Sequence, residues 1–216
     1  MRVLVLTVDQ RGSTRAGAGD RVPEVLAGLA TLTTPAGAGV LRAFERTAGD
    51  EFQGVLDDPD LLAPVLERLL RGGGWSIGIG VGEVEEPLPE STRAGRGAAY
   101  LHAREAVTSA KSAPWHLRVA GDRPAARDLE SALWLWAALL ARRTARGWEV
   151  ADLVDSGLRY DEVAARLGVT PSAISQRAAA AGILEGLRAR ELVTTIVGGL
   201  LQDGSPPAVG AERSHP

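Results

Sequence analysis

The chain contains no cysteine, and this absence excludes disulfide bonds and thiolate metal sites. It has only three histidines, His102, His116 and His215, which are too few and too scattered to form a zinc site. The formal net charge of −3 provides no overall basic field that would attract nucleic acid, and no polybasic anchor for a membrane surface. Any contact with DNA must therefore come from a local surface.

Long apolar runs are missing as well. The longest, residues 133–141, is about half of a membrane span. The short apolar run of residues 3–6 is soon followed by Asp9 and has no cleavage region behind it, so we expect no signal peptide. The apolar fraction of 45 % is typical of a globular protein. We therefore expect a soluble cytoplasmic protein without a membrane partner.

Strand and helix signals alternate through the first half of the chain. Residues 2–8 are rich in valine and leucine, which predicts a buried strand, and Asp20 is a good N-cap for a helix that runs to Leu32. Residues 47–50 predict a hairpin turn with Asp50 at its tip. The same patterns predict strands over residues 40–46, 51–56, 75–84 and 115–120, and helices over residues 58–71 and 97–112. The first six elements thus have the order β-α-β-β-α-β.

Three glycines alternate along the strand predicted over residues 75–84. Gly78, Gly80 and Gly82 lack the G-x-G-x-x-G spacing of a phosphate-binding loop. Glycine in a strand interior often marks a place where another backbone approaches closely. We therefore predict that this strand packs tightly under a helix.

Residues 160–182 predict two short helices around a tight turn. Gly168 permits the left-handed backbone that a sharp turn needs, Thr170 is a good N-cap, and Pro171 suits the first position of the second helix. Small hydroxyl and amide side chains on such a helix can contact base edges in the major groove, and an arginine can bind a phosphate or a guanine. We predict a helix-turn-helix whose DNA-binding residues are Thr170, Pro171, Ser172, Ser175, Gln176 and Arg177. The alternative is a helical hairpin that only packs.

The local charge around this motif is weakly positive. Residues 159–190 contain five arginines and three acidic residues, a net charge of +2. Because phosphate contacts supply most non-specific affinity for DNA, so small an excess requires help from dimerisation and from a well-placed second helix. We therefore expect a homodimer.

The remaining segments divide the chain. Residues 122–147 contain a leucine and tryptophan stripe that predicts a connecting or dimerising helix, and residues 183–201 predict an apolar helix that needs a partner. We expect domains over residues 1–121 and 148–202, joined by the helix of residues 122–147, with a disordered tail over residues 203–216.

Two aspartates of the first half are candidates for a metal site. Asp9 ends the first strand, and a β-α-β-β arrangement brings the hairpin that carries Asp50 next to that strand end. Two converging carboxylates can hold Mg²⁺, which takes oxygen ligands and usually arrives with a phosphate. The turn of Gly12, Ser13 and Thr14 could bind that phosphate. The alternative is that loop N–H groups satisfy both carboxylates locally.

Three segments carry a resemblance to a known family. V-D-Q-R-G-S-T-R from Val8, E-R-T-A-G-D-E-F-Q-G-V-L from Glu45, and S-I-G-I-G-V-G-E-V-E-E-P-L from Ser76 resemble successive signatures of class III nucleotide cyclase domains. The resemblance covers roughly residues 1–111. It implies an α+β fold with a ferredoxin-like core, Asp9 and Asp50 as metal ligands, and a nucleotide triphosphate pocket that is often completed across a dimer.

The sequence also departs from the cyclase pattern. Arg46 stands where cyclases have a lysine that helps to read the base, and Tyr100 stands where they have an asparagine, although Arg104 matches the arginine that stabilises the transferring phosphoryl group. Phosphoryl transfer depends on positioning, so these changes favour nucleotide sensing over turnover. The nucleotide-binding candidates are Gly12, Ser13, Thr14 and Arg46, and Arg104 is catalytic only if the domain is a cyclase.

A cyclase-like half followed by an all-α helix-turn-helix domain resembles the SatD family of bacterial proteins. The expected function is a DNA-binding transcriptional regulator whose cyclase-like domain dimerises or senses a nucleotide. The alternative is an active Mg²⁺-dependent nucleotidyl cyclase with an attached helix-turn-helix. A third possibility is that both halves are protein-interaction scaffolds.

Overall fold

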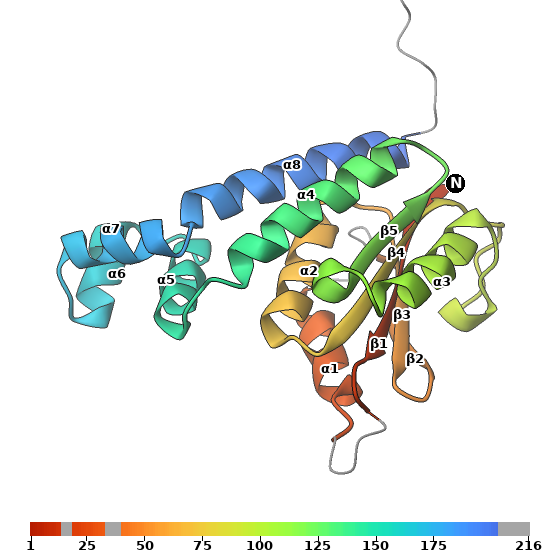
Figure 1. Cartoon of the computed structure of the whole chain (residues 1–216), viewed down its shortest axis with the longest axis horizontal. Helices are drawn as coiled ribbons and strands as arrows, with labels where there is room; N and C mark the ends of the chain where they lie inside the picture. The colour runs from red at the N-terminus through yellow and green to blue at the C-terminus, as the bar shows by residue number, and fades with distance from the viewer. Residues whose placement is uncertain (14–18, 33–39, 203–216) are drawn as a thin grey trace, which may run out of the picture.

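A five-stranded mixed sheet forms the centre of the protein, with helices against both of its faces (Figure 1). The computed structural model describes residues 1–13, 19–32 and 40–202. The strands are β1 (Arg2–Gln10), β2 (Val40–Ala48), β3 (Glu51–Leu56), β4 (Trp75–Glu83) and β5 (Leu117–Gly121). The predicted α+β class is confirmed, while the predicted loop over residues 33–39 and the predicted tail from residue 203 lie outside the described residues.

The order of the strands is β2-β3-β1-β4-β5. The pairs β2–β3, β3–β1 and β1–β4 are antiparallel, and β4–β5 is parallel. Strand β1 is therefore central, and its alternating side chains divide between two cores. Leu4, Leu6 and Val8 contribute to the larger core, whereas Val3 and Val5 contribute to a smaller one.

Helices α1 (Val22–Leu32) and α2 (Pro59–Gly72) pack on the larger core. Both begin where the sequence predicts. The Asp20 carboxylate accepts a hydrogen bond from the N–H of Val22 at 3.0 Å, and Asp58 is the N-cap of α2, with its carboxylate 2.8 Å from the N–H of Asp60. These caps satisfy N–H groups that have no partner within a helix.

Helix α3 (Ala98–Ala110) covers the opposite face of the sheet and lies very close to β4. A Cβ atom added to Gly80 would stand 2.1 Å from the carbonyl oxygen of Ala99 and 2.2 Å from the backbone nitrogen of Ala103. A Cβ at Gly78 would stand 2.2 Å from the nitrogen of Val107. The predicted tight packing of this strand under a helix is confirmed.

The second half of the chain is helical. Its elements are α4 (Ala125–Leu140), α5 (Ala145–Asp155), α6 (Tyr160–Leu167), α7 (Pro171–Ala180) and α8 (Ile183–Leu201). Helices α4 and α8 lie side by side along the sheet domain, while α5, α6 and α7 form a head at one end of the molecule (Figure 1). The larger core continues through Trp136 and Trp148 into this head.

The single helix expected over residues 122–147 is in fact two helices. Helix α4 ends at Leu140, and α5 begins after Thr144, whose hydroxyl accepts a hydrogen bond from the N–H of Gly147 at 3.2 Å. In the turn between them the side chain of Arg143 is buried, and its guanidinium donates a hydrogen bond to the carbonyl of Ala181 at 2.9 Å. A local N-cap and a buried arginine thus end the helix earlier than the apolar stripe suggests.

The strand expected from residue 115 begins two residues later, at Leu117. The backbone of Trp115 and His116 has φ angles of 57° and 49°, which belong to the left-handed region. Residues in that region cannot continue an extended strand. A short 3-10 helix, η2 (Pro114–His116), therefore precedes β5.

A network of charged side chains joins the head to the sheet domain. Glu67 of α2 accepts from Arg190 of α8 at 2.7 Å, and the same guanidinium donates to Asp155 of α5 at 2.7 Å. Arg71 of α2 lies over the ring of Trp148 at 4.5 Å, and Arg143 lies over that ring at 4.8 Å. These contacts hold α5 against α2, so the head has a defined orientation.

Arg2 and Asp122 form an ion pair at the other end of the sheet. The guanidinium donates two hydrogen bonds to the carboxylate, at 2.8 and 2.5 Å, and a third to the carbonyl of Leu200 at 2.9 Å. The hydrogen bonds from Arg2 lower the pKa of Asp122 from 3.8 to about 2. The start of β1, the end of β5 and the end of α8 are thereby tied together.

This pair predicts a pH dependence of stability. A carboxylate whose pKa is lowered on folding stabilises the native state above its unfolded pKa, and this contribution is lost as the pH falls through the native pKa. In urea unfolding, the advantage of the wild type over Asp122→Asn should be constant above about pH 5 and should shrink towards pH 2. Parallel pH profiles for the two proteins would contradict the pairing.

Candidate functional site

Helix α7 is held by the local signals that the sequence contains. Gly168 adopts the left-handed conformation, with φ 64° and ψ 34°, and ends α6. The Thr170 hydroxyl accepts a hydrogen bond from the N–H of Ala173 at 3.2 Å, and Pro171 occupies the first helical position. Ile174 and Ala178 are buried and fix one face of α7 in the head.

The opposite face of α7 points to solvent. Ser172, Ser175 and Gln176 are all exposed, and Arg177 is partly buried beside them. The Ser175 hydroxyl donates to the Pro171 carbonyl of its own helix at 3.1 Å. Because α7 lies at the end of the molecule that is farthest from the sheet, neither the sheet nor α3 covers this face (Figure 1). The six residues predicted to bind DNA thus lie together on and before one short helix.

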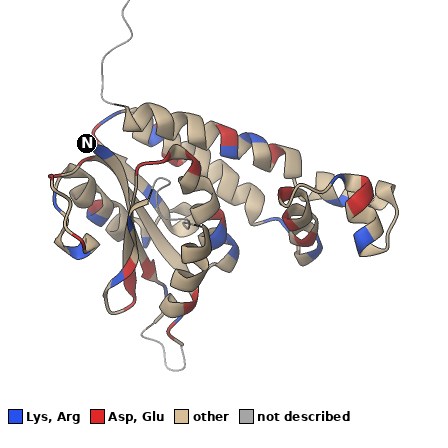
Figure 2. Cartoon of the chain, turned by 180° about the vertical axis from the view of Figure 1, so that it is seen from behind, with Lys and Arg blue, Asp and Glu red and all other residues tan. Residues whose placement is uncertain are grey.

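The head carries charges of both signs (Figure 2). Arg159 is paired with Asp161 at 2.8 Å. Within the part of the chain that the structure describes, Arg166 and Arg177 take part in no ion pair. Two arginines near α7 therefore remain available for an anionic partner such as a phosphate group.

A cavity of about 490 Å³ lies on the α3 face of the sheet, at the end of β1. It brings together the two aspartates of the predicted metal site, Asp9 and Asp50, and the predicted Arg104. Asp9 is opposite Glu51 in the β1–β3 register, so Glu51 adds a third carboxylate. Asp50 adjoins this pair because its carbonyl accepts a hydrogen bond from the N–H of Gln10 at 3.2 Å.

One cation from the middle of α3 and one from the residue that follows it neutralise these carboxylates. The Nζ of Lys111 is 2.9 Å from Asp9, and a guanidinium nitrogen of Arg104 is 3.2 Å from Glu51. The hydrogen bond with Asp9 raises the pKa of Lys111, and the negative charges of Asp50 and Glu51 act in the same direction. The carboxylates are therefore attractive to cations, and Lys111 supplies one from the protein itself.

The wall of the cavity is built from η1 (Thr92–Ala94) and the start of α3. Glu45 of β2 holds η1, because its carboxylate accepts from the hydroxyl of Ser91 and the N–H of Thr92, both at 2.6 Å. The hydrogen bond from Ser91 is the main cause that lowers the pKa of Glu45. Tyr100 also lines the cavity; its hydroxyl is buried without a hydrogen-bond partner in the described structure, and burial raises its pKa.

The other predicted nucleotide-binding residues are not brought to this cavity. Gly12 and Ser13 follow β1 without lining it, and Thr14 lies outside the described residues. Arg46 is paired with Phe52 of the larger core, so it belongs to the opposite face of the sheet from Asp9. Its guanidinium is 2.5 Å from the Asp20 carboxylate and also donates to the Gly49 carbonyl.

The carboxylate oxygens that line the cavity are the type of ligand atom that binds a hard cation. Carboxylate oxygens are the ligands that Mg²⁺ prefers in proteins. Among residues 1–13, 19–32 and 40–202, however, no three His, Cys, Asp or Glu side chains are close enough together to hold a metal ion by themselves. A magnesium ion at Asp9 and Asp50 would therefore take further oxygens from water or from a ligand such as a phosphate.

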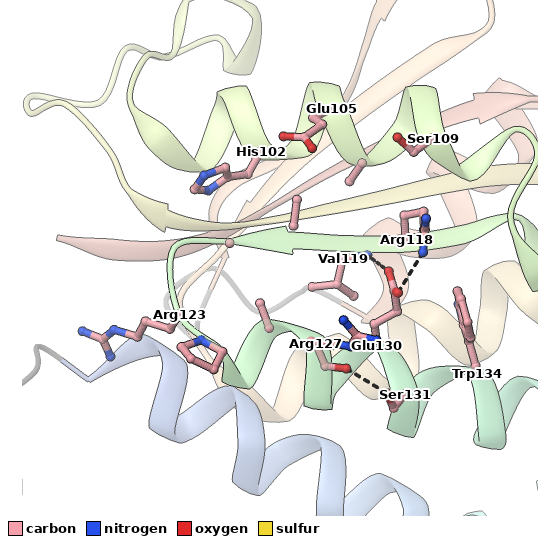
Figure 3. A pocket seen from close by; sticks show the side chains of 15 residues that line it. His102, Glu105, Ser109, Arg118, Val119, Arg123, Arg127, Glu130, Ser131 and Trp134 are labelled. Atoms are coloured by element: carbon pink, nitrogen blue, oxygen red, sulfur yellow. Dashed lines mark hydrogen bonds and ion pairs between the residues drawn. The ribbon is translucent and has the colours of Figure 1, made fainter.

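A second cavity, of about 640 Å³, lies along the free edge of β5 between α3 and α4 (Figure 3). Side chains of α4 cap the backbone of this edge. Glu130 accepts from the N–H of Val119 at 2.9 Å and from Arg118 at 3.0 Å, and the indole of Trp134 donates to the Leu117 carbonyl at 2.9 Å. Such caps protect an edge strand from pairing with another chain.

Comparison of the chain with family models, curated proteins and solved structures gives no match. None of the helices in the described part of the chain is both long enough and apolar enough to span a bilayer.

The sequence patterns do not predict the roles of Glu51 and Lys111 or the cavity at the edge of β5. The alternation of Glu51 with Gln53 and Val55 indicates a shared face, but only the register with β1 aligns it with Asp9. No local signal links Lys111 to Asp9, since they are far apart in sequence. The residues around the β5 edge come from three separate elements.

Proposed function

We propose that the protein is a DNA-binding regulator in which α6 and α7 form a helix-turn-helix and α7 enters the major groove. The observation that carries this proposal is the exposed polar face of Ser172, Ser175 and Gln176 on a helix that is anchored from behind by Ile174. A helix of this kind is the usual reader of base edges. Arg166 and Arg177 would contact the flanking phosphates.

Selection of binding sites from a pool of random DNA duplexes tests this function. The purified full chain should enrich a defined sequence motif over several rounds. Binding should weaken steeply with salt, because each phosphate contact releases a counterion. A well-folded protein that enriches no motif and is not retained on duplex DNA would overturn the proposal.

The resemblance to cyclases and to the SatD family remains part of the proposal. The antiparallel order β2-β3-β1-β4, with α1 and α2 packed on one core, supports a ferredoxin-like β-α-β-β-α-β unit. Asp9 and Asp50 line a common cavity, which supports a ligand site in that unit. We infer that this cavity takes a nucleotide as an effector in a cytoplasmic regulator.

A bound magnesium ion would neutralise the phosphate charge of such a nucleotide. Asp9 and Asp50 would hold the ion, and Lys111, which now pairs with Asp9, would have to release that carboxylate. Arg104 would remain near the phosphates. The residues of this chain thus bind and orient the nucleotide, and Tyr100 closes the side of the cavity.

This arrangement predicts opposite effects of two substitutions on the binding of Mn²⁺, used as a probe for Mg²⁺, in the presence of nucleotide. Asp9→Asn should abolish calorimetric binding because it removes an anionic ligand. Lys111→Met should strengthen binding by about tenfold because no internal cation competes, which corresponds to about 1.4 kcal/mol. Weaker binding by Lys111→Met would contradict the competition and would indicate that Lys111 contacts the phosphates instead.

The alternative function is an active nucleotidyl cyclase, and it is favoured by the position of Arg104 on the same cavity as Asp9 and Asp50. Incubation with ATP or GTP and Mg²⁺ separates the two functions. A cyclic product that Asp9→Ala no longer makes would establish the enzyme. Nucleotide binding without product would establish the sensor.

A further inference from the structure

Helix α8 has an apolar surface that no described part of the chain covers. Leu184 and Leu192 are 66 % and 52 % exposed, and Leu187 is 37 % exposed. Leu135 of the adjacent α4 is 76 % exposed. Large exposed apolar side chains are typical of a protein–protein interface, because burying them against a partner lowers the free energy.

The exposed face of α8 is symmetric in its residue spacing. Leu184, Arg188, Glu191 and Thr195 are separated by four, three and four residues, so they lie in one stripe along the helix. The midpoint of this stripe lies between residues 189 and 190, and Leu187 and Leu192 flank the stripe at equal distances from the same midpoint. A two-fold axis at this midpoint would place α8 antiparallel to its own copy.

The charges of the stripe are self-complementary in this register. About the two-fold axis, Arg188 of each copy faces Glu191 of the other, and Leu184 faces Thr195. Both charged side chains are largely exposed, and they now pair within their own helix at 2.7 Å. The Thr195 hydroxyl donates to the Glu191 carbonyl at 2.9 Å, which leaves its methyl group free to meet a leucine.

We propose that the protein forms a homodimer through the outer face of α8, with the two helices antiparallel and Arg188 opposite Glu191 of the second copy. An isologous interface requires a patch that complements itself, and this stripe does so in both charge and apolarity. The proposal stands apart from DNA binding, since it rests on the surface of α8 alone.

The register also gives a spacing that suits the proposed function. From Ile183, where α8 begins, to the midpoint is about 10 Å at 1.5 Å per residue, so the two heads would start about 20 Å apart along the helix axis. Helices α7 lie beyond these starts. Recognition helices of dimeric DNA-binding proteins are about 34 Å apart. Because the midpoint lies near the head end of α8, the separation of the two α7 helices in this dimer is comparable with the spacing of recognition helices.

Charge reversal tests the dimer. Sedimentation should detect a wild-type dimer, and Arg188→Glu and Glu191→Arg should each weaken association by about tenfold or more, because each places like charges across the axis twice. The double variant should recover the dimer. An equimolar mixture of the two single variants should form a heterodimer, because the reversed partners then match across the interface. Circular dichroism confirms that each variant is folded.

Each outcome decides the proposal. A monomeric wild type, or single variants that associate as the wild type does, would overturn it. If both single variants dissociate but their mixture stays monomeric, the charges act only within one helix and the antiparallel register is wrong. Loss of the dimer with DNA affinity retained by monomers would separate this inference from the proposed function.

Discussion

Removal of the Gln176 and Arg177 side chains together is expected to weaken binding to a selected DNA site about 100-fold. A bidentate contact from Gln176 to a base would contribute about 1–3 kcal/mol, and a phosphate contact from Arg177 would add to it. A loss of about 1.4 kcal/mol corresponds to a factor of ten. Because both residues lie beside or on the exposed face of α7, the substitutions should leave the fold intact. Titration of a labelled duplex with Gln176→Ala plus Arg177→Ala measures the loss.

The matched control removes the same residue types elsewhere. Gln202 and Arg96 are exposed, far in sequence from α7. Gln202→Ala plus Arg96→Ala should bind the duplex like the wild type, while its net charge equals that of the α7 variant. Equal affinity of both double variants and the wild type would show that α7 does not contact DNA. Urea unfolding of all three proteins checks that stability is unchanged.

Gly80→Ala is expected to lower the free energy of unfolding by about 3 kcal/mol or more, or to prevent folding. The new methyl group would stand within 2.2 Å of backbone atoms of α3, and a backbone cannot rotate away as a side chain can. Helix α3 would have to move away from the sheet. Arg104 would then leave the cavity, and Lys111, which follows α3, would lose its ion pair with Asp9. Urea denaturation measures the effect.

Gly198→Ala in α8 is the control for this change. A Cβ at Gly198 meets nothing within 4 Å, so the substitution should stabilise the protein by about 0.5–1 kcal/mol through the higher helix propensity of alanine. If Gly80→Ala were as stable as the wild type, the close approach of α3 to β4 would be wrong.

Most helices and strands can be predicted from the sequence because neighbouring residues, such as N-caps and first-turn prolines, fix where they begin. Thr170 and Pro171 fix the start of α7 within one turn of helix, and Asp58 does the same for α2. The alternating glycines of β4 indicate that a helix packs closely on this strand, but they do not indicate which helix. The end of α4 at Leu140 was missed because its cause, the inward turn of Arg143 to the Ala181 carbonyl, involves residues that are far apart in sequence.

The candidate cavity was predictable only in part. Asp9 and Asp50 converge because a strand end and a hairpin tip meet in the fold order that the sequence indicates. The pairing of Lys111 with Asp9 depends on where α3 ends above the sheet, and the side of Arg46 depends on strand register. The register of β2 against β3 shifts between Arg42 and Glu45 and again between Arg46 and Ala48. A shift of one residue reverses the face on which a side chain lies, so simple alternation along the sequence does not predict the side of Arg46.

The lack of cysteine in the chain allows the most direct test of the central claim, that α7 enters the groove of DNA. Gln176→Cys introduces a unique thiol that can carry an iron chelate for DNA cleavage. We expect cleavage confined to a few base pairs within the selected DNA site, and none from the same chelate at Arg96→Cys. Binding of both proteins to the duplex with no cleavage from position 176 above the level of position 96 would contradict it.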